Sequence, residues 1–241
     1  MLPQEIMTIR QIGDTRSPYW AAATLDGATV LLEPGEVLLH TGYCQVSAAS
    51  PEPRKLPGSA LAVTQRRTVF LTTQFDTGGG WTGFGLAGLA VAVTANAVSK
   101  RRAARRSAGQ VAIGQVRHEW LTGISLRRRK ALIGAVDTYL DLTVATARGT
   151  QVIELWNAHT ISEDFARWLV RTVSQNRAEL LGPGAAADAA AVPNSKPGGQ
   201  RAAPADRPGD IGWSFRGNTD ELIAAAIAVQ GRLADPLGTT R

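Results

Sequence analysis

One stretch constrains the fold of this chain more than any other, the run over residues 78–106, which joins two segments that both resemble β-strand. Residues 83–98 carry no charged side chain, and at Lys100 the run changes abruptly, so that five of the seven residues 100–106 are basic. An uncharged run of small and aliphatic residues of this length is typical of a helix that is buried or lies at an interface. We therefore expect an apolar helix with a cationic end, inserted into a sheet.

The apolar run is close to, but shorter than, the roughly twenty residues that a helix needs to cross a bilayer. A single span would also place the strands before and after it on opposite sides of the membrane, and alanine and glycine insert weakly compared with leucine. A buried or interfacial helix is therefore favoured over a single-pass membrane protein. The apolar side chains expected to make its contacts are Trp81, Phe84, Leu86, Leu89, Val91 and Val93.

Positive charge is concentrated in two short runs. The chain has a net charge of +6, and nine of its 26 lysines and arginines lie in these runs. Clustered positive charge attracts an anionic partner, and beside an apolar helix anionic headgroups are favoured. The alternative is a solvated protein surface. Nucleic acid is not expected, because the runs lack interleaved aromatic residues and no nucleic-acid-binding signature is present. The candidate anion-binding residues are Lys100, Arg101, Arg102, Arg105 and Arg106 in the first run, and Arg127, Arg128, Arg129 and Lys130 in an expected basic turn.

A glycine fingerprint overlaps the start of the apolar run. Gly83, Gly85 and Gly88 match G-x-G-x-x-G between an expected strand and an expected helix, which is the context in which a pyrophosphate can bind helical N–H groups. However, no acidic residue follows about twenty residues later, and the next segments are hairpins rather than βα units. Close helix packing is the favoured role of these glycines, and a nucleotide-binding enzyme is a weaker alternative.

Residues suited to catalysis or metal binding are sparse. His40, His118 and His159 each lie alone, and no serine elbow, metal-ligand spacing or carboxylate pair is present. The single cysteine, Cys44, cannot form an internal disulfide and favours a reducing compartment. The first residues do not form a signal peptide. We expect no catalytic residues, no metal and no cofactor, and a cytoplasmic location at the inner face of the cell membrane.

Hydrophobic alternation predicts strands on both sides of the insertion. A turn at Pro34-Gly35 precedes a strand over 37–46, a breaker-rich loop follows over 49–58, and two strands flank the turn at 65–67. Further strand is expected over 111–124 and a short one over 131–136, before a hairpin that turns at Arg148-Gly149. Ser162 caps a helix that ends near Gly182, and its apolar stripe, expected to lie on the sheet, comprises Ile161, Phe165, Trp168, Leu169 and Val173.

The chain divides into four parts on composition. Residues 1–31 form a lead-in, 32–182 a domain with the insertion 78–106, 183–209 a linker, and 210–241 a short helical segment. The linker is rich in alanine, proline and glycine without apolar periodicity, so we expect it to be flexible. Asn218 and Glu221 form a capping signature for a helix over 219–234. This tethered helix is expected to add little to the stability of the domain unless it docks onto it.

The strand pair 58–70 and the tripeptide Pro34-Gly35-Glu36 before the first long strand resemble the GRAM-like branch of the pleckstrin-homology (PH) superfold, in a bacterial type. The resemblance covers roughly residues 32–176. It implies an α+β fold, a bent antiparallel β-barrel with a C-terminal capping helix, that binds lipid or docks onto protein without catalysis. The insertion at 78–106 departs from the family pattern, so no family binding residues are carried over.

These observations together predict a non-enzymatic PH/GRAM-like module. Its expected partner is an anionic membrane surface or a membrane-bound protein, contacted through the inserted helix and the basic cluster. The alternative is a soluble protein-interaction module in which the helix is part of the core or a self-association face. A nucleotide-binding enzyme and a single-pass membrane protein are less favoured.

Overall fold

A computed structural model describes residues 2–12, 29–49, 53–72, 108–130, 136–157, 160–181, 210–215 and 219–230. The expected inserted helix with its basic end, at 78–106, and the expected linker, at 183–209, lie outside the described residues. The descriptions that follow refer to the described part of the chain.

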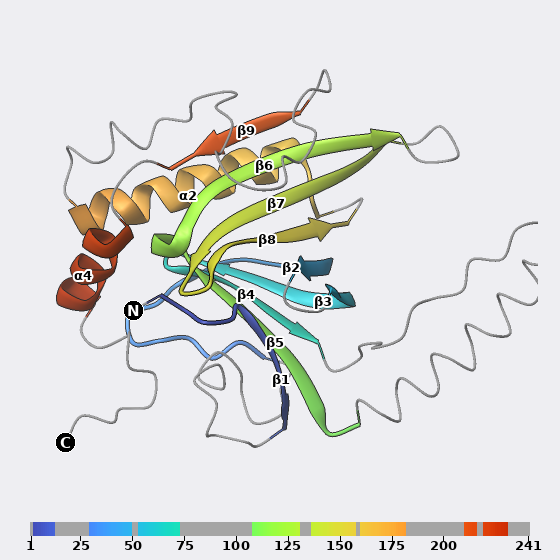
Figure 1. Ribbon diagram of the computed structural model, residues 1–241, viewed down its shortest axis with the longest axis horizontal. Helices are drawn as coiled ribbons and strands as arrows, with labels where there is room; N and C mark the ends of the chain where they lie inside the picture. The colour runs from blue at the N-terminus through green and yellow to red at the C-terminus, as the bar shows by residue number, and fades with distance from the viewer. Residues whose placement is uncertain are drawn as a thin grey trace, which may run out of the picture.

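The described chain is dominated by one antiparallel sheet of nine strands in the order β1-β5-β4-β3-β2-β8-β7-β6-β9 (Figure 1). A short 3-10 helix, η2 (His118–Trp120), joins β5 to β6, and two longer helices follow, α2 (Glu163–Leu181) and α4 (Thr219–Gln230). The strands are β1 (Met7–Gln11), β2 (Leu38–Ala49), β3 (Pro53–Thr64), β4 (Arg67–Thr72), β5 (Gln110–Arg117), β6 (Leu121–Lys130), β7 (Val136–Thr146), β8 (Gly149–Trp156) and β9 (Ile211–Ser214).

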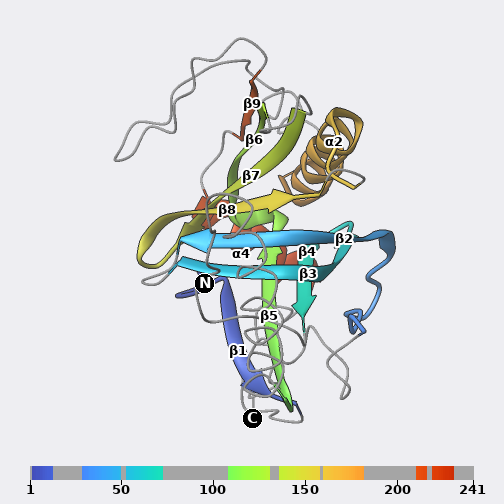
Figure 2. The same ribbon diagram turned by 90° about the vertical axis from the view of Figure 1, so that its right-hand side faces the viewer.

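The sheet bends strongly but does not close. Figure 2 shows β2 and β3 running across the middle of the molecule, with β1 and β5 on one side and β6, β7 and β9 on the other. Among the described strands, β1 pairs only with β5 and β9 only with β6. The sheet-rich α+β class is confirmed, whereas the prediction of a barrel is wrong, because the two edge strands of the described sheet, β1 and β9, do not pair with each other.

The predicted hairpins are confirmed. β3 and β4 are joined through Gln65 and Arg66, and β7 and β8 pair from Thr146 and Gly149 outward. The backbone of Gly149 has φ 106, a conformation that favours glycine. Alternation places Leu140 and Leu142 of β7 in the core, so the period-two pattern correctly identified both the strand and its buried face.

Two predicted connections are strands instead. The breaker-rich loop expected at 49–58 is largely taken up by the end of β2 and the start of β3, and the register shifts between Cys44 and Val46, opposite Pro57 and Gly58. A bulge of this kind lets proline enter a strand without breaking the whole ladder. The basic turn expected at 127–130 is the end of β6, where Arg127 pairs with Tyr139 of β7 and Lys130 with Val136.

Helix α2 covers the core face of the β6 side of the sheet (Figure 1). The backbone N–H of Phe165 donates to Ser162 Oγ at 3.1 Å, so the predicted cap is confirmed, and the helix ends at Leu181 as expected. Phe165, Leu169 and Val173 are buried in the main core together with strand residues of β6, β7 and β8. The apolar stripe therefore lies on the sheet as predicted.

The C-terminal segment is packed into the fold rather than tethered beside it. β9, which the sequence did not predict, pairs with residues 123–126 of β6, and Trp213 and Phe215 belong to the main core. In α4, Leu222 and Ala226 pack against Leu180 of α2. The segment therefore docks onto the domain, which is the one condition under which it was expected to contribute to stability.

Candidate functional site

A tight turn precedes β2 and begins the most distinctive site of the described chain. Glu36 N–H donates to the carbonyl of Glu33 at 2.9 Å, with Pro34 and Gly35 at the two central positions. Pro34 fixes its own φ, and Gly35 has φ 69, which is the combination that a type II turn requires. The sequence prediction of a turn at Pro34-Gly35 is confirmed.

A buried ion pair lies beneath this turn. Arg67, the first residue of β4, donates through Nε and Nη2 to the two carboxylate oxygens of Glu36 at 2.9 and 2.8 Å. The side chains are 1% and 0% exposed, and Thr64 Oγ1 donates to the same carboxylate at 2.6 Å. Burial opposes ionisation of Glu36, but its hydrogen bonds and the charge of Arg67 hold its pKa below the ordinary value. The pair is therefore charged and desolvated.

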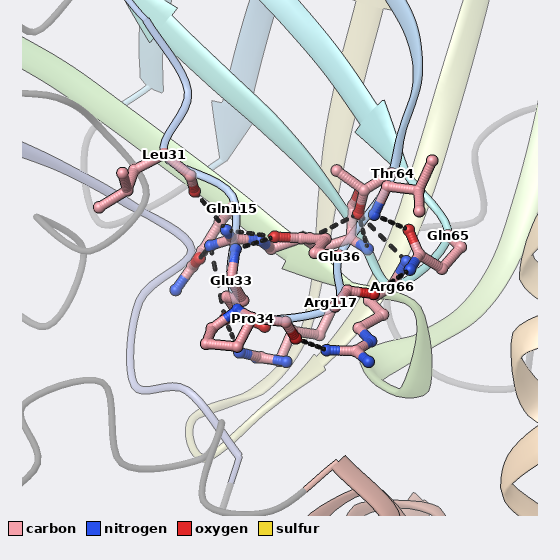
Figure 3. A network of polar contacts seen from close by, with 12 residues as sticks. Leu31, Glu33, Pro34, Glu36, Thr64, Gln65, Arg66, Gln115 and Arg117 are labelled. Carbon is pink, nitrogen blue, oxygen red and sulfur yellow. Dashed lines mark hydrogen bonds and ion pairs between the residues drawn. The ribbon is translucent and has the colours of Figure 1, made fainter.

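Further contacts tie the turn to strands that are distant in sequence (Figure 3). Arg67 also donates to Gln115 Oε1 of β5 at 2.9 Å and to the carbonyl of Leu31 at 2.8 Å. Glu33 forms an ion pair with Arg117, at the end of β5. The segment from Leu31 to Glu36 is thus held against β4 and β5, and its conformation is set by the folded sheet.

The backbone of the turn is paired with side chains of the connection between β3 and β4. Gln65 accepts from Val37 N–H at 2.6 Å and donates through Nε2 to the carbonyl of Gly35 at 2.9 Å. Arg66 Nη1 donates to the carbonyl of Pro34 at 3.1 Å, and Glu33 N–H donates to Glu36 Oε2 at 2.7 Å. An exposed turn commonly leaves such groups to water, whereas here the protein itself satisfies them.

Aliphatic side chains project from both sides of this turn. We call them the apolar rim, and each is between 40% and 56% exposed: Leu31, Leu32, Val37, Leu38 and Leu39. The register of β2 with β3 shifts between Leu38 and His40, and this bulge accounts for two consecutive exposed leucines in a strand. Clustered exposed aliphatic side chains mark contact surfaces for a partner or a membrane.

Sequence reasoning did not identify the apolar rim. Residues 37–39 belong to the strand predicted over 37–46, for which no exposed apolar surface was predicted. The available signal is the near-symmetric run LLEPGEVLL, in which apolar residues flank a turn on both sides. Alternation cannot bury all of them, since neighbouring residues of a strand point to opposite faces.

The second basic run lies on β6, and its arginines form ion pairs with acidic residues of neighbouring elements. Arg127 donates to both oxygens of Asp141 at 2.5 and 2.6 Å and to Glu154 Oε2 at 2.6 Å. Burial disfavours the charged guanidinium, yet these acidic partners raise the pKa of Arg127 above its ordinary value. Arg127 therefore belongs to an internal ion-pair cluster across β6, β7 and β8.

The next two arginines of this run also have acidic neighbours. Arg128 Nη2 lies 2.6 Å from Glu163 of α2, and Arg129 lies 4.0 Å from Glu154 and stacks over Tyr139 at 4.9 Å. This pairing favours a protein surface over an anion-binding role for 127–129. The side chain of Lys130 and the whole first run, from Lys100 to Arg106, lie outside the described side chains, so their role stays a prediction.

The surroundings of His40, His118 and Cys44 fit a structural role for each of them. His118 Nδ1 lies 3.1 Å from the carbonyl of Gln65, and burial lowers its pKa to about 4. His40 packs against Phe165 and Trp168, with ring centroids 5.2 and 5.6 Å away. Burial raises the pKa of the Cys44 thiol to about 12, so the thiolate is strongly disfavoured. His159 lies outside the described residues.

Two kinds of site are absent from the described ranges. No group of three or more His, Cys, Asp or Glu residues there is placed to hold a metal ion. None of the described helices has the length and apolarity needed to cross a bilayer. The candidate span at 83–98 and the glycine fingerprint lie outside these ranges.

Comparisons of the sequence with protein-family models and with curated proteins gave no match. The candidate site consists of a turn whose charged side chains are buried in ion pairs and whose aliphatic side chains are exposed.

Proposed function

We propose that this chain is a non-enzymatic docking module of PH/GRAM-like type that attaches to an anionic membrane surface or to a protein held there. The observation that supports this most is the apolar rim around Pro34-Gly35. Its aliphatic side chains are exposed on a segment that the buried Glu36–Arg67 pair holds in place. A rigid, exposed aliphatic surface is suited to contact rather than to chemistry.

The polar groups near the turn support a non-enzymatic role. Glu36 and Arg67 are buried against each other, and Gln115 is bound to Arg67. An ion pair so enclosed is unsuited to proton transfer with a substrate. Every strand pair among the described residues is antiparallel, which differs from the βαβ context that a dinucleotide-binding glycine fingerprint requires.

The proposed attachment combines the apolar rim with the first basic run. Residues 100–106 carry five basic side chains, each of which contributes on the order of 1 kcal/mol near an anionic surface. The proposed location is the cytoplasmic face of the cell membrane. The inserted helix at 83–98 remains a second proposed contact or a self-association face.

Sedimentation with phospholipid vesicles tests this function. Binding of the whole chain should require acidic lipid and fall as salt shortens the Debye length from about 10 Å at 0.1 M to about 3 Å at 1 M. A variant with glutamine at Lys100, Arg101, Arg102, Arg105 and Arg106 should bind less. If the unmodified chain ignores acidic vesicles at low salt, membrane attachment fails and protein docking replaces it.

A protein-interaction module is the second candidate, and it is favoured by the outer face of β2, β7 and β8. Tyr43 is 68% exposed there, and Tyr139 and Trp156 stack with centroids 6.2 Å apart. Arg129 lies over the Tyr139 ring. Tyrosine, tryptophan and arginine are the residues most enriched in protein-interface hot spots.

The nucleotide-binding alternative has its own test. We expect dinucleotides to produce no thermal shift, because the acidic ribose partner is missing from the sequence. A saturable shift that disappears in Gly85→Val would revive the enzyme hypothesis.

A further inference from the structure

The composition of the apolar rim indicates the kind of partner it fits. All five side chains are leucine or valine. Protein-interface hot spots are enriched in tryptophan, tyrosine and arginine and depleted in leucine and valine. Fluid hydrocarbon needs no matching pocket and accepts aliphatic side chains of any arrangement. The composition of the rim therefore fits a lipid interface better than a protein pocket.

The hydrogen bonding of the turn is the second and independent observation. A backbone group that enters hydrocarbon must find its partner within the protein, because water is absent there. Gln65 binds Val37 N–H and the carbonyl of Gly35, and Arg66 binds the carbonyl of Pro34. Pro34 has no N–H of its own. The tip of the turn can thus leave water without breaking these bonds.

The charges of the segment fit an anionic surface. Its two carboxylates, Glu33 and Glu36, are at most 10% exposed and are paired with Arg117 and Arg67. They therefore present little negative charge to a headgroup. Arg66 is partly exposed, and its guanidinium donates to the carbonyl of Pro34 in the turn. A guanidinium beside the turn is suited to bind lipid phosphate with the donors that Pro34 leaves unused.

We infer that the apolar rim inserts into the interfacial layer of an anionic bilayer, with the turn at Pro34-Gly35 leading and Arg66 at the depth of the headgroup phosphates. The inference rests on the proposed membrane attachment and names the surface that makes it. Insertion is shallow, because the turn leads directly into β2 of the folded sheet.

A single fluorescent label measures the insertion directly. Cys44 is buried and its thiol has a raised pKa, so an added cysteine is the site that reacts. Leu39→Cys, labelled with a polarity-sensitive fluorophore, places the probe on the rim. Val152→Cys is a matched control, because Val152 is also an exposed aliphatic residue, 40% against 45% for Leu39. It lies near the other end of β2, where Ala48 pairs with Ile153.

On binding vesicles of mixed neutral and acidic phospholipid, the label at position 39 should shift to the blue. It should also be quenched by nitroxide-labelled acyl chains, while the label at position 152 keeps its aqueous spectrum. Bound protein whose position 39 label stays aqueous overturns the inference and leaves membrane attachment intact. An unmodified chain that binds no vesicles at all removes both the inference and the proposed attachment.

Substitution gives a second measurement that needs no label. The double variant Leu38→Gln, Leu39→Gln should weaken vesicle partitioning roughly tenfold, in line with the apolar area withdrawn from water. Val152→Gln should leave partitioning unchanged. Both variants should keep the melting temperature, since the replaced side chains are exposed. Unchanged partitioning of a folded double variant contradicts the inference, whatever part the basic run plays.

Discussion

Two regions of this molecule place charge in opposite ways. At the turn before β2, the charged side chains of Glu36 and Arg67 lie inside and aliphatic side chains lie outside. At the end of β6, Arg128 and Arg129 lie outside, and Leu126 before them is buried. The basic run at 127–129 is matched by carboxylates, while the less conspicuous turn exposes a contact surface. The partners on neighbouring strands, rather than the number of arginines, decide which surface is available.

The ion pairs of the two regions should contribute very differently to the free energy of unfolding, because they differ in exposure. The Glu36–Arg67 side chains are 0% and 1% exposed, whereas those of Glu163 and Arg128 are 33% and 44% exposed. Breaking a buried pair leaves an uncompensated charge, while an exposed pair is screened and contributes little. Substitutions in the two regions provide the test of this comparison.

The largest effect is expected from Arg67→Met, which leaves Glu36 and Gln115 without their shared partner. We expect a loss of about 3–5 kcal/mol in the free energy of unfolding, measured with urea. The double variant Glu36→Leu, Arg67→Met should recover part of this loss, because neither charge is then buried alone. A loss below 1 kcal/mol for Arg67→Met would show that the pair is solvated.

The buried region should also respond to pH through His118. Burial lowers the pKa of His118 to about 4 from an ordinary value of 6.5. As the pH falls, the unfolded chain therefore binds the proton before the folded chain does. The stability contributed by neutral His118 is fully present above pH 6.5 and is lost as the pH falls towards 4. The loss is about 3 kcal/mol. Urea unfolding at pH 7 and pH 4.5 should show a smaller difference for His118→Gln than for the unmodified chain.

Arg127 should give an intermediate effect, because it is partly buried and binds two carboxylates. Arg127→Gln is expected to cost about 2 kcal/mol of stability, within the range for hydrogen bonds to charged groups. The matched comparison is Arg148→Gln, whose single ion pair with Glu5 is exposed. Equal destabilisation by the two substitutions would contradict the placement of Arg127 in an internal cluster.

The smallest effect is expected from Arg128→Gln, Arg129→Gln. The free energy of unfolding should change by less than about 1 kcal/mol, because both ion pairs are exposed. Vesicle binding should also be nearly unchanged, in contrast to the five-glutamine variant of residues 100–106. A loss of vesicle binding as large as in that variant would restore 127–129 as an anion-binding surface.

Patterns among neighbouring residues predicted the strands, turns and helix that such short patterns specify. Alternation and turn chemistry located β4, β7, β8 and the second half of β3, and Ser162 with the apolar stripe located α2. The strand β9 was missed because its four residues are too few to show a period. The barrel does not close because β9 and β1, the two edge strands of the described sheet, do not pair with each other.

The candidate site could not be predicted from patterns among neighbouring residues, because its partners are far apart in the sequence. Glu36 and Arg67 are 31 positions apart, and Arg67 and Gln115 are 48 apart, so only the folded sheet brings them together. The run LLEPGEVLL indicates that some of its apolar residues are exposed, but the bulge that exposes both Leu38 and Leu39 depends on the pairing of β2 with β3. Likewise, the acidic partners of Arg127 come from β7 and β8.

The position of β9 has a consequence during synthesis of the chain on the ribosome. Leu126 of β6 pairs with Ile211, so at about 5–20 residues per second the ribosome needs roughly 4–17 s to supply the 85 positions that separate these partners. During that interval the outer edge of β6 has no strand to pair with, and an unpaired edge recruits other chains. Basic side chains deter such pairing, and β6 ends in four of them. We expect a chain ending at Gly182 to aggregate as its concentration rises, and to do so sooner when Arg128 and Arg129 are glutamine.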